Sequence, residues 1–193
     1  QTWIDELIWR DFYQHVTVDF PQVCKNRPLQ AHTDAFPWRY DQADFDAWCR
    51  GETGIPIIDA AMRQLLATGW MHNRLRMVVA MFLTKNLRID WRWGESWFMC
   101  QLIDGDFAAN NGGWQWSAST GTDAAPYFRI FNPVTQSQRF DPQADFIRSY
   151  LPVLRSLSDK AIHQPPPTPG YPAQMVDLKA SRKETIALFK ALN

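Results

Sequence analysis

The hydrophobic residues between Asn73 and Leu87 constrain the fold of this chain more tightly than any other feature. They recur at the i, i+3, i+4, i+7 and i+8 positions of one helical face, a stripe made of Leu75, Val78, Val79, Phe82 and Leu83. This spacing predicts an amphipathic helix over residues 73–87 that buries the stripe in a core.

Other segments also show helical spacing, and none shows the alternation of a half-buried strand. Pro56 and Gly69 are typical of the first residue and the C-terminal cap of a helix over residues 57–68. We expect further helices over residues 2–16, 44–49, 97–103, 142–154 and 179–192. Residues 104–113 and 117–133 are expected to form turns and loops, and residues 164–172, with five prolines, an extended connector. The sequence therefore predicts an all-α fold.

The first predicted helix has two distinct sides. One is an apolar stripe that we expect to be buried, made of Ile4, Leu7, Ile8, Phe12 and Val16. The opposite side carries Glu6, Trp9, Arg10 and Tyr13, and this mixture of acid, base and aromatic groups is unusual for a solvent-facing surface. We expect that second side to line a cavity.

Composition narrows the class of protein. The chain has 193 residues, of which 46% are hydrophobic and 21% charged, which is typical of one globular domain. No apolar run approaches the roughly 20 residues of a membrane helix, and three scattered cysteines predict neither a disulfide framework nor a zinc site. We expect a cytoplasmic, nucleoid-associated monomer with no membrane contact. Because the formal net charge is zero, any nucleic-acid contact must be local.

Three clusters of residues could carry chemistry. Asn73, Arg74 and Arg76 begin a helix, where backbone N–H groups favour anions, although a solvated helix start is the more common explanation of such residues. Asp104 and Asp106 do not fit a calcium loop, because alanines occupy the next ligand and glycine positions. These carboxylates could bind ribose hydroxyls or pair with Arg76.

Tryptophans form the third cluster. The chain has ten, and several lie close to arginines or glycines, as in the segment from Trp114 to Trp116. Aromatic faces beside arginines can stack against extruded bases, and a buried core cluster is the alternative. Spacing alone does not distinguish the two.

Taken together, these segments resemble the signature of the photolyase and cryptochrome family. The first segment spans residues 53–77 and ends in TGWMHNRLRM. The second spans residues 104–133 and contains DGD, NNGGWQW, TGTD and PYFRIFNP. The likeness covers nearly the whole chain, weakens beyond about Leu157, and is greatest to bacterial class I enzymes that act on cyclobutane pyrimidine dimers.

The resemblance implies a cofactor and a partner. It implies a helical domain that holds FAD, whose reduced anion donates an electron, after absorbing light, to a flipped-out dimer in UV-damaged DNA. Residues 1–193 would then be the C-terminal part of this FAD- and DNA-binding domain. The family's α/β domain with its antenna chromophore, a folate or a deazaflavin, would be absent from the chain.

Residue roles follow from the same resemblance. The implied catalytic residues are Glu6 and Asn110, and Glu6, held against Trp9 away from bulk water, would donate a hydrogen bond to the dimer. The implied electron-transfer chain is Trp114, Trp91 and Trp38. The implied cofactor-binding residues are Trp3, Asn73, Arg76, Asp104, Gly105, Asp106 and Asn110. The implied substrate- and DNA-binding residues are Glu6, Trp9, Asn73, Arg74, Met77, Trp116 and Arg129.

Other functions remain open at this stage. A cryptochrome, which responds to blue light without repairing DNA, shares much of the pattern. A photolyase for (6-4) lesions is disfavoured because the paired histidines expected around His72 are absent. A helical DNA-binding module without catalysis is the simplest alternative, and it would show neither yellow colour nor light dependence.

Overall fold

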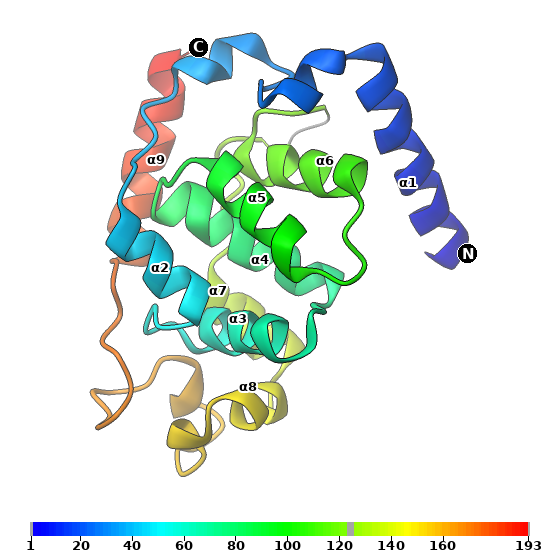
Figure 1. Cartoon of the computed structure of the whole chain (residues 1–193). Helices are drawn as coiled ribbons and strands as arrows, with labels where there is room; N and C mark the ends of the chain where they lie inside the picture. The colour runs from blue at the N-terminus through cyan, green and yellow to red at the C-terminus, as the bar shows by residue number, and fades with distance from the viewer. Residues whose placement is uncertain (1, 123–125, 193) are drawn as a thin grey trace.

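The computed structural model describes residues 2–122 and 126–192, and within them it confirms the all-α prediction (Figure 1). The helices are α1 (Thr2–Asp19), α2 (Gln42–Arg50), α3 (Pro56–Thr68), α4 (Asn73–Met81), α5 (Trp91–Gln101), α6 (Phe107–Ala118), α7 (Pro133–Phe140), α8 (Asp145–Tyr150) and α9 (Leu178–Leu192). Five shorter helical segments are η1 (Pro21–Lys25), η2 (Ala31–Ala35), η3 (Phe82–Asn86), η4 (Pro152–Leu154) and η5 (Ala161–His163). Across these ranges the β-type pairing is limited to one isolated bridge, between Arg39 and Ile89.

Helices α3 and α4 form the centre of the core, largely as their spacing predicts. Pro56 begins α3, and Gly69 ends it in the left-handed conformation with φ of 67°. The predicted helix over residues 73–87 is α4 followed directly by the wider π-type turn of η3. Four members of its apolar stripe are fully buried, and Leu75 is partly buried.

The predicted burial of the α1 stripe is wrong. Ile4 and Ile8 are 58% and 60% exposed, and Phe12 is also exposed. Helix α1 stands at the right-hand edge of the molecule and packs against α6 and η1 (Figure 1). This packing uses the Tyr13 ring, which lies close to Gly112. A Cβ added to Gly112 would lie 2.1 Å from the Tyr13 ring. The glycine allows the contact. Ile4, Ile8 and Phe12 face solvent, whereas Leu7 and Val16 are half-buried.

The prediction of turns over residues 104–113 is also wrong beyond Asp106, because α6 begins at Phe107. The Asp106 carboxylate caps this helix by accepting a hydrogen bond from the Ala109 N–H at 2.9 Å. The pair Gly112 and Gly113 indicated a turn, but both residues lie inside the helix. Glycine normally disfavours the interior of a helix, but Gly112 is accommodated here because α1 packs closely against it.

Three further predictions about helices differ from the structure. Helix α5 begins at Trp91, capped by Asp90, well before residue 97. Helix α7 was not predicted, although Asn132 caps it and Pro133 is its first residue. The helix expected over residues 142–154 is split into α8 and η4. Asp123, part of the family-like TGTD segment, lies outside the described residues.

Candidate functional site

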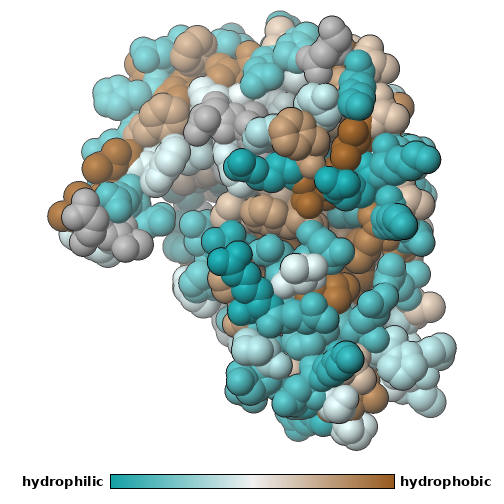
Figure 2. Space-filling view, turned by 180° about the vertical axis from the view of Figure 1, so that it is seen from behind, coloured by the Kyte–Doolittle hydropathy of each residue, from teal (hydrophilic) through white to brown (hydrophobic). Residues whose placement is uncertain are grey.

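Helix α6 brings most of the predicted site residues together, because α1 and α4 both pack against it. Trp3, Glu6 and Trp9 come from α1, the segment from Asn73 to Met77 begins α4, and Asn110, Trp114 and Trp116 belong to α6. Figure 2 shows α1 as an arm that stands away from the body above an open notch. All of these residues lie within the described ranges, 2–122 and 126–192.

Arg76 and Asp104 form an ion pair beside the start of α4. Both carboxylate oxygens accept hydrogen bonds from Arg76 Nη2, at 3.0 and 2.8 Å. Arg76 Nε also donates to the Met71 carbonyl at 2.7 Å, which fixes the plane of the guanidinium. The structure thereby confirms the predicted pairing and joins α4 to the loop before α6.

The other two residues of the DGD segment have local structural roles. Gly105 lies in an exposed turn, where its N–H donates to the Leu102 carbonyl at 3.4 Å. Asp106 caps α6, so one of its oxygens is already engaged. The Asp106 residue is otherwise exposed.

A polar network holds α6 in place, and the sequence analysis assigned no role to three of its members, Glu95, Asn111 and Gln115. The Asn110 amide donates to the Glu95 carbonyl at 2.9 Å, while Asn111 donates to the Glu95 carboxylate at 3.3 Å. Gln115 donates to Asn111 Oδ1 at 2.9 Å and accepts from the Leu29 N–H, also at 2.9 Å. Burial raises the pKa of Glu95, and the hydrogen bond from Asn111 partly opposes this. The i, i+4 spacing of Asn111 and Gln115 was the available signal.

Lys85 fixes the C-terminal end of α6. Its ammonium donates to the Ala118 carbonyl at 3.1 Å and to Ser119 Oγ at 2.6 Å, and it lies 3.9 Å from the centroid of the Phe189 ring. Burial lowers the pKa of Lys85 well below the usual lysine value. A donor at the last carbonyls of a helix is favourable. Because Lys85 also contacts the Phe189 ring, it joins the end of α6 to α9.

The three tryptophans of the implied electron-transfer chain lie in neighbouring segments. The residue after Trp38 pairs with Ile89, two positions before Trp91. Trp91 lies one helical turn before Gly94, and a Cβ on Gly94 would come within 2.1 Å of the Trp114 ring. The three tryptophans are all buried, at 8% exposure or less, and lie in segments that neighbour one another.

Two of these indoles have an unusual environment. Trp38 is 8% exposed and Trp91 is fully buried, yet neither indole N–H has a hydrogen-bond partner among the described residues. An unsatisfied buried donor costs about 1–3 kcal/mol. The implied role of these residues in electron transfer stays a prediction.

The α1 residues are more accessible than the sequence predicts. Glu6 is exposed, Trp3 and Trp9 are 74% and 47% exposed, and the Trp9 ring lies 5.6 Å from that of Phe12. The expectation that Glu6 is held away from bulk water is thus wrong for this structure. Arg129 is also exposed, in the segment before α7, where no bonded partner of its guanidinium is recorded in residues 2–122 or 126–192.

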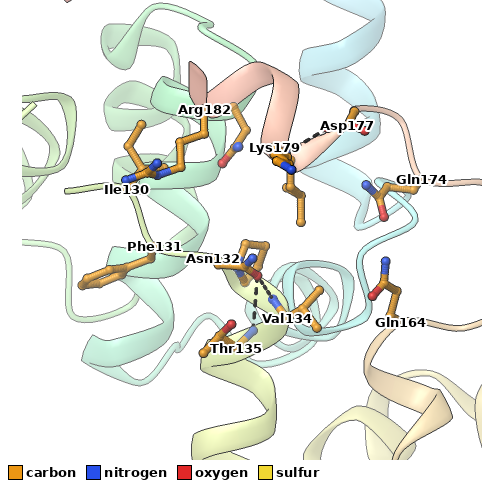
Figure 3. A pocket seen from close by; sticks show the side chains of 13 residues that line it. Ile130, Phe131, Asn132, Val134, Thr135, Gln164, Gln174, Asp177, Lys179 and Arg182 are labelled. Atoms are coloured by element: carbon orange, nitrogen blue, oxygen red, sulfur yellow. Dashed lines mark hydrogen bonds between the residues drawn. The ribbon is translucent and has the colours of Figure 1, made fainter. Parts of the chain in front are cut away.

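A separate polar pocket of about 410 Å³ lies between the N-termini of α7 and α9 (Figure 3). Gln164 and Gln174 flank one side, and Asn132 points into its centre while capping α7. None of the predicted site residues lines this pocket. The described residues also contain no cluster of side chains suited to a metal ion, and none of their helices is long and apolar enough to span a membrane.

Comparison with known proteins identifies the family. Residues 3–191 match the family model described as the FAD binding domain of DNA photolyase. The chain is 58% identical to a deoxyribodipyrimidine photo-lyase of Vibrio cholerae and 56% identical to that of Escherichia coli, in each case over 98% of this chain and 42% of the relative. It therefore spans about 42% of the length of these relatives.

Solved structures agree with this match. A class III photolyase of Agrobacterium tumefaciens superposes with a TM-score of 0.94 at 43% identity, covering 99% of this chain and 42% of that one. A cryptochrome of Synechocystis superposes with a TM-score of 0.90 at 40% identity, covering 96% of this chain and 41% of that one. The chain belongs to the family of FAD-binding domains of DNA photolyases.

Proposed function

We propose that the intact protein repairs cyclobutane pyrimidine dimers in DNA by light-driven electron transfer, and that this chain supplies much of the flavin and lesion site. When bound, reduced FAD supplies the excited electron that opens the cyclobutane ring. Support comes from the family match and from the named activity of relatives at 56–58% identity. The observation that carries the proposal is that α1 and α4 both pack against α6. An open notch lies beside the α1 arm (Figure 2).

The residues present fit a flavin. Beside the buried Trp114, a Cβ on Gly113 would meet no atom within 4 Å, so this side of α6 leaves room for a bound ring system. Arg76 and Asp104 offer a rigid charged pair that can meet polar edges of the cofactor. The Asn110 side-chain N–H donates to the Glu95 carbonyl, and this hydrogen bond fixes the orientation of the side chain. The side-chain oxygen of Asn110 is then presented as an acceptor.

The lesion would enter from the side of α1 and the start of α4. Glu6 and Trp9 lie on one face of α1, three residues apart, and offer a hydrogen-bonding group beside an aromatic surface. Asn73, Arg74 and Met77 of α4 and Trp116 of α6 would complete the lesion site. Docking of a dimer against Trp9 would shield Glu6 from water, which the structure without a substrate does not do.

The tryptophan path serves a different step. Trp38, Trp91 and Trp114 would pass electrons, one at a time, from a thiol reductant in solution inward to oxidised flavin. Two electrons and one proton are needed to restore the active reduced form. Tryptophan suits this step because its large ring accepts and releases an electron without moving. These residues do not touch the dimer, so repair by an already reduced protein would not need them.

The decisive test uses the intact, chemically reduced protein with a dimer-containing oligonucleotide. Illumination should restore the absorbance of intact pyrimidines, and samples kept in the dark should not change. Arg76→Ala should lower flavin content by leaving Asp104 without its partner, whereas Arg50→Ala, which breaks a surface pair with Glu52, should not. A flavin-loaded, reduced protein that leaves dimers intact under light would refute the proposal.

A signalling function is the second candidate, and it rests on the similarity to the Synechocystis cryptochrome. A cryptochrome-type receptor would undergo the same photoreduction through its tryptophans but would not open dimers. The same illumination experiment separates the two functions, because photoreduction without repair would favour the receptor.

A further inference from the structure

A line of neighbouring aromatic rings joins the protein surface to Trp114. The ring centroids of Tyr40 and Trp93 are 5.8 Å apart, and those of Trp93 and Phe45 are 5.2 Å apart. The Phe45 ring stacks on Trp48 at 5.8 Å, and Trp48 lies 6.0 Å from Trp114. Each distance is within the usual range for aromatic contacts, about 4.5–7 Å. These five residues are called the Tyr40 path below.

Exposure to solvent increases along this path from its inner to its outer end. Trp114 and Trp48 are 2% and 0% exposed, and Phe45 and Trp93 are half-buried. Tyr40, at the outer end, is 65% exposed. A reductant in solution can therefore reach Tyr40 without entering the core.

The Tyr40 hydroxyl has a proton acceptor next to it. It donates a hydrogen bond to Asp90 Oδ2 at 3.0 Å. Asp90 is 3% exposed, and its carboxylate also accepts hydrogen bonds from the backbone N–H and the guanidinium of Arg92, at 3.0 to 3.3 Å. Partial burial of the hydroxyl and its hydrogen bond to Asp90 raise the pKa of Tyr40, so the phenol keeps its proton in the resting protein. A carboxylate fixed in this position can take the proton that a tyrosine releases when it loses an electron.

Packing explains the inner part of the path but not its outer end. Trp48 fills the core, and its indole N–H donates to the Val79 carbonyl at 3.2 Å. Tyr40 leaves 65% of its surface in water, so burial of its ring contributes little to stability. An oxidisable ring in water that contacts a line of more buried rings, and that is hydrogen-bonded to a carboxylate, is suited to electron entry.

We propose that the Tyr40 path is a second route for electrons to Trp114, in which a thiol in solution reduces Tyr40 and Asp90 accepts the Tyr40 proton. This inference rests on the proposed reduction of flavin through Trp114. The path shares Trp114 with the implied electron-transfer chain but contains neither Trp38 nor Trp91. Electrons would therefore still reach Trp114 when the implied chain is interrupted.

The electron and proton steps of this route balance. Light moves one electron from Trp114 to oxidised flavin, and electrons then move inward along the path until the last one leaves Tyr40. Phenylalanine is too hard to oxidise to carry the charge itself, so electrons cross the Phe45 ring in one step. As Tyr40 loses its electron, its proton passes along the hydrogen bond to Asp90, which releases it to water. A thiol then gives a hydrogen atom to the Tyr40 oxygen. After two such events two thiols have become one disulfide, two electrons and one proton have gone to the flavin, and one proton has gone to water.

The first measurement needs no flavin. In the flavin-free intact protein, azide radicals generated by pulse radiolysis oxidise tryptophan, and the absorbance of tryptophan radicals should then decay as that of a tyrosine radical grows, at a rate independent of protein concentration. Tyr40→Phe should remove this tyrosine signal, because phenylalanine keeps the ring but has no oxidisable hydroxyl. Asp90→Asn should slow its growth, because an amide does not take the proton. Tyr150→Phe, which changes a partly buried tyrosine outside the path, is the matched control and should leave the signal unchanged.

The second measurement follows photoreduction of the intact, flavin-loaded protein with a thiol in solution. Trp38→Phe alone should keep part of the photoreduction, because the Tyr40 path still supplies Trp114. Trp38→Phe combined with Tyr40→Phe should lose that remainder, whereas Trp38→Phe combined with Tyr150→Phe should keep it.

The outcomes distinguish the Tyr40 path from the repair function. If Tyr40→Phe leaves the tyrosine radical signal of the flavin-free protein unchanged, the path does not conduct, whatever the repair activity. The same conclusion follows if Trp38→Phe alone already abolishes photoreduction. If the Tyr40 and Asp90 variants behave as expected but the chemically reduced protein leaves dimers intact under light, the repair function fails and the path stands.

Discussion

Replacing Gly94 by alanine tests how tightly Trp114 is packed between α5 and α6. A Cβ at this position would lie 2.1 Å from Trp114 Cη2 and 2.7 Å from Leu83 Cδ2. Carbon atoms in contact are normally about 3.5–4.0 Å apart, so the indole would have to retreat by more than about 1 Å. Both obstructing side chains are buried, which leaves them little room to move.

The net effect follows from two opposing contributions. Overpacking a well-filled core costs about 1–3 kcal/mol, and the upper end applies because two rigid neighbours block the new methyl group. Alanine is favoured over glycine inside a helix by about 1 kcal/mol. Gly94→Ala should therefore lower the free energy of unfolding by about 2 kcal/mol, which corresponds to a melting temperature about 4–8 °C lower for a chain of this length.

The assay is thermal unfolding of flavin-free protein followed by circular dichroism. Gly113→Ala is the matched control, because Gly113 also lies inside a helix but an added Cβ meets no atom within 4 Å. The control should raise the melting temperature by about 2–4 °C through helix propensity alone. If Gly94→Ala is as stable as the control, Trp114 is not held as the structure shows.

Three further predictions concern other parts of the chain. Trp38→Phe should slow photoreduction of oxidised flavin while leaving repair by chemically reduced protein intact. Transient absorption measures the photoreduction and a repair assay measures the repair, and loss of both activities would contradict the electron-transfer role. Tyr171→Phe should lower the free energy of unfolding in urea by about 1–3 kcal/mol, because it removes a 2.6 Å hydrogen bond to buried Asp59; Tyr150→Phe is the control. Because burial raises the pKa of Glu95, the folded state binds its proton more tightly than the unfolded chain, so Glu95 lowers stability as pH rises above about 4.3. The stability of Glu95→Gln relative to the unmodified protein should therefore increase with pH in urea titrations, and a constant difference would exclude a raised pKa.

Local sequence patterns predicted much of the fold because local physics decides those elements. The stripe of α4 has one face to bury, and the Pro56 and Gly69 signals for α3 depend only on backbone geometry. The ion pair between Arg76 and Asp104 was also predicted, although 28 residues separate the partners. From the residues this pairing was one of several alternatives, and the resemblance to the family singled out Asp104.

The failures have one cause, which is that a distant element changes what a local pattern means. Gly112 and Gly113 indicate a turn until α1 is known to pack against Gly112 through Tyr13. The apolar stripe containing Ile4 and Ile8 indicates burial, but in the described chain α6 and η1 are the elements that mainly pack on α1, and they leave these two residues exposed. Likewise, nothing in the local sequence of Arg139 shows that the ring of Phe140 also holds Arg74.

The two sides of the candidate site differ in how firmly the chain holds them. Helix α6 is capped by Asp106, bound along one face through Asn111 and Gln115, and held at its C-terminal end by Lys85. Helix α1 meets it mainly through the Tyr13 contact and leaves its first half in solvent. Substitutions in α6 should therefore alter stability and function together, whereas substitutions of exposed α1 residues such as Trp9 should alter lesion binding with little effect on stability. Function on the α1 side can thus be measured separately from folding.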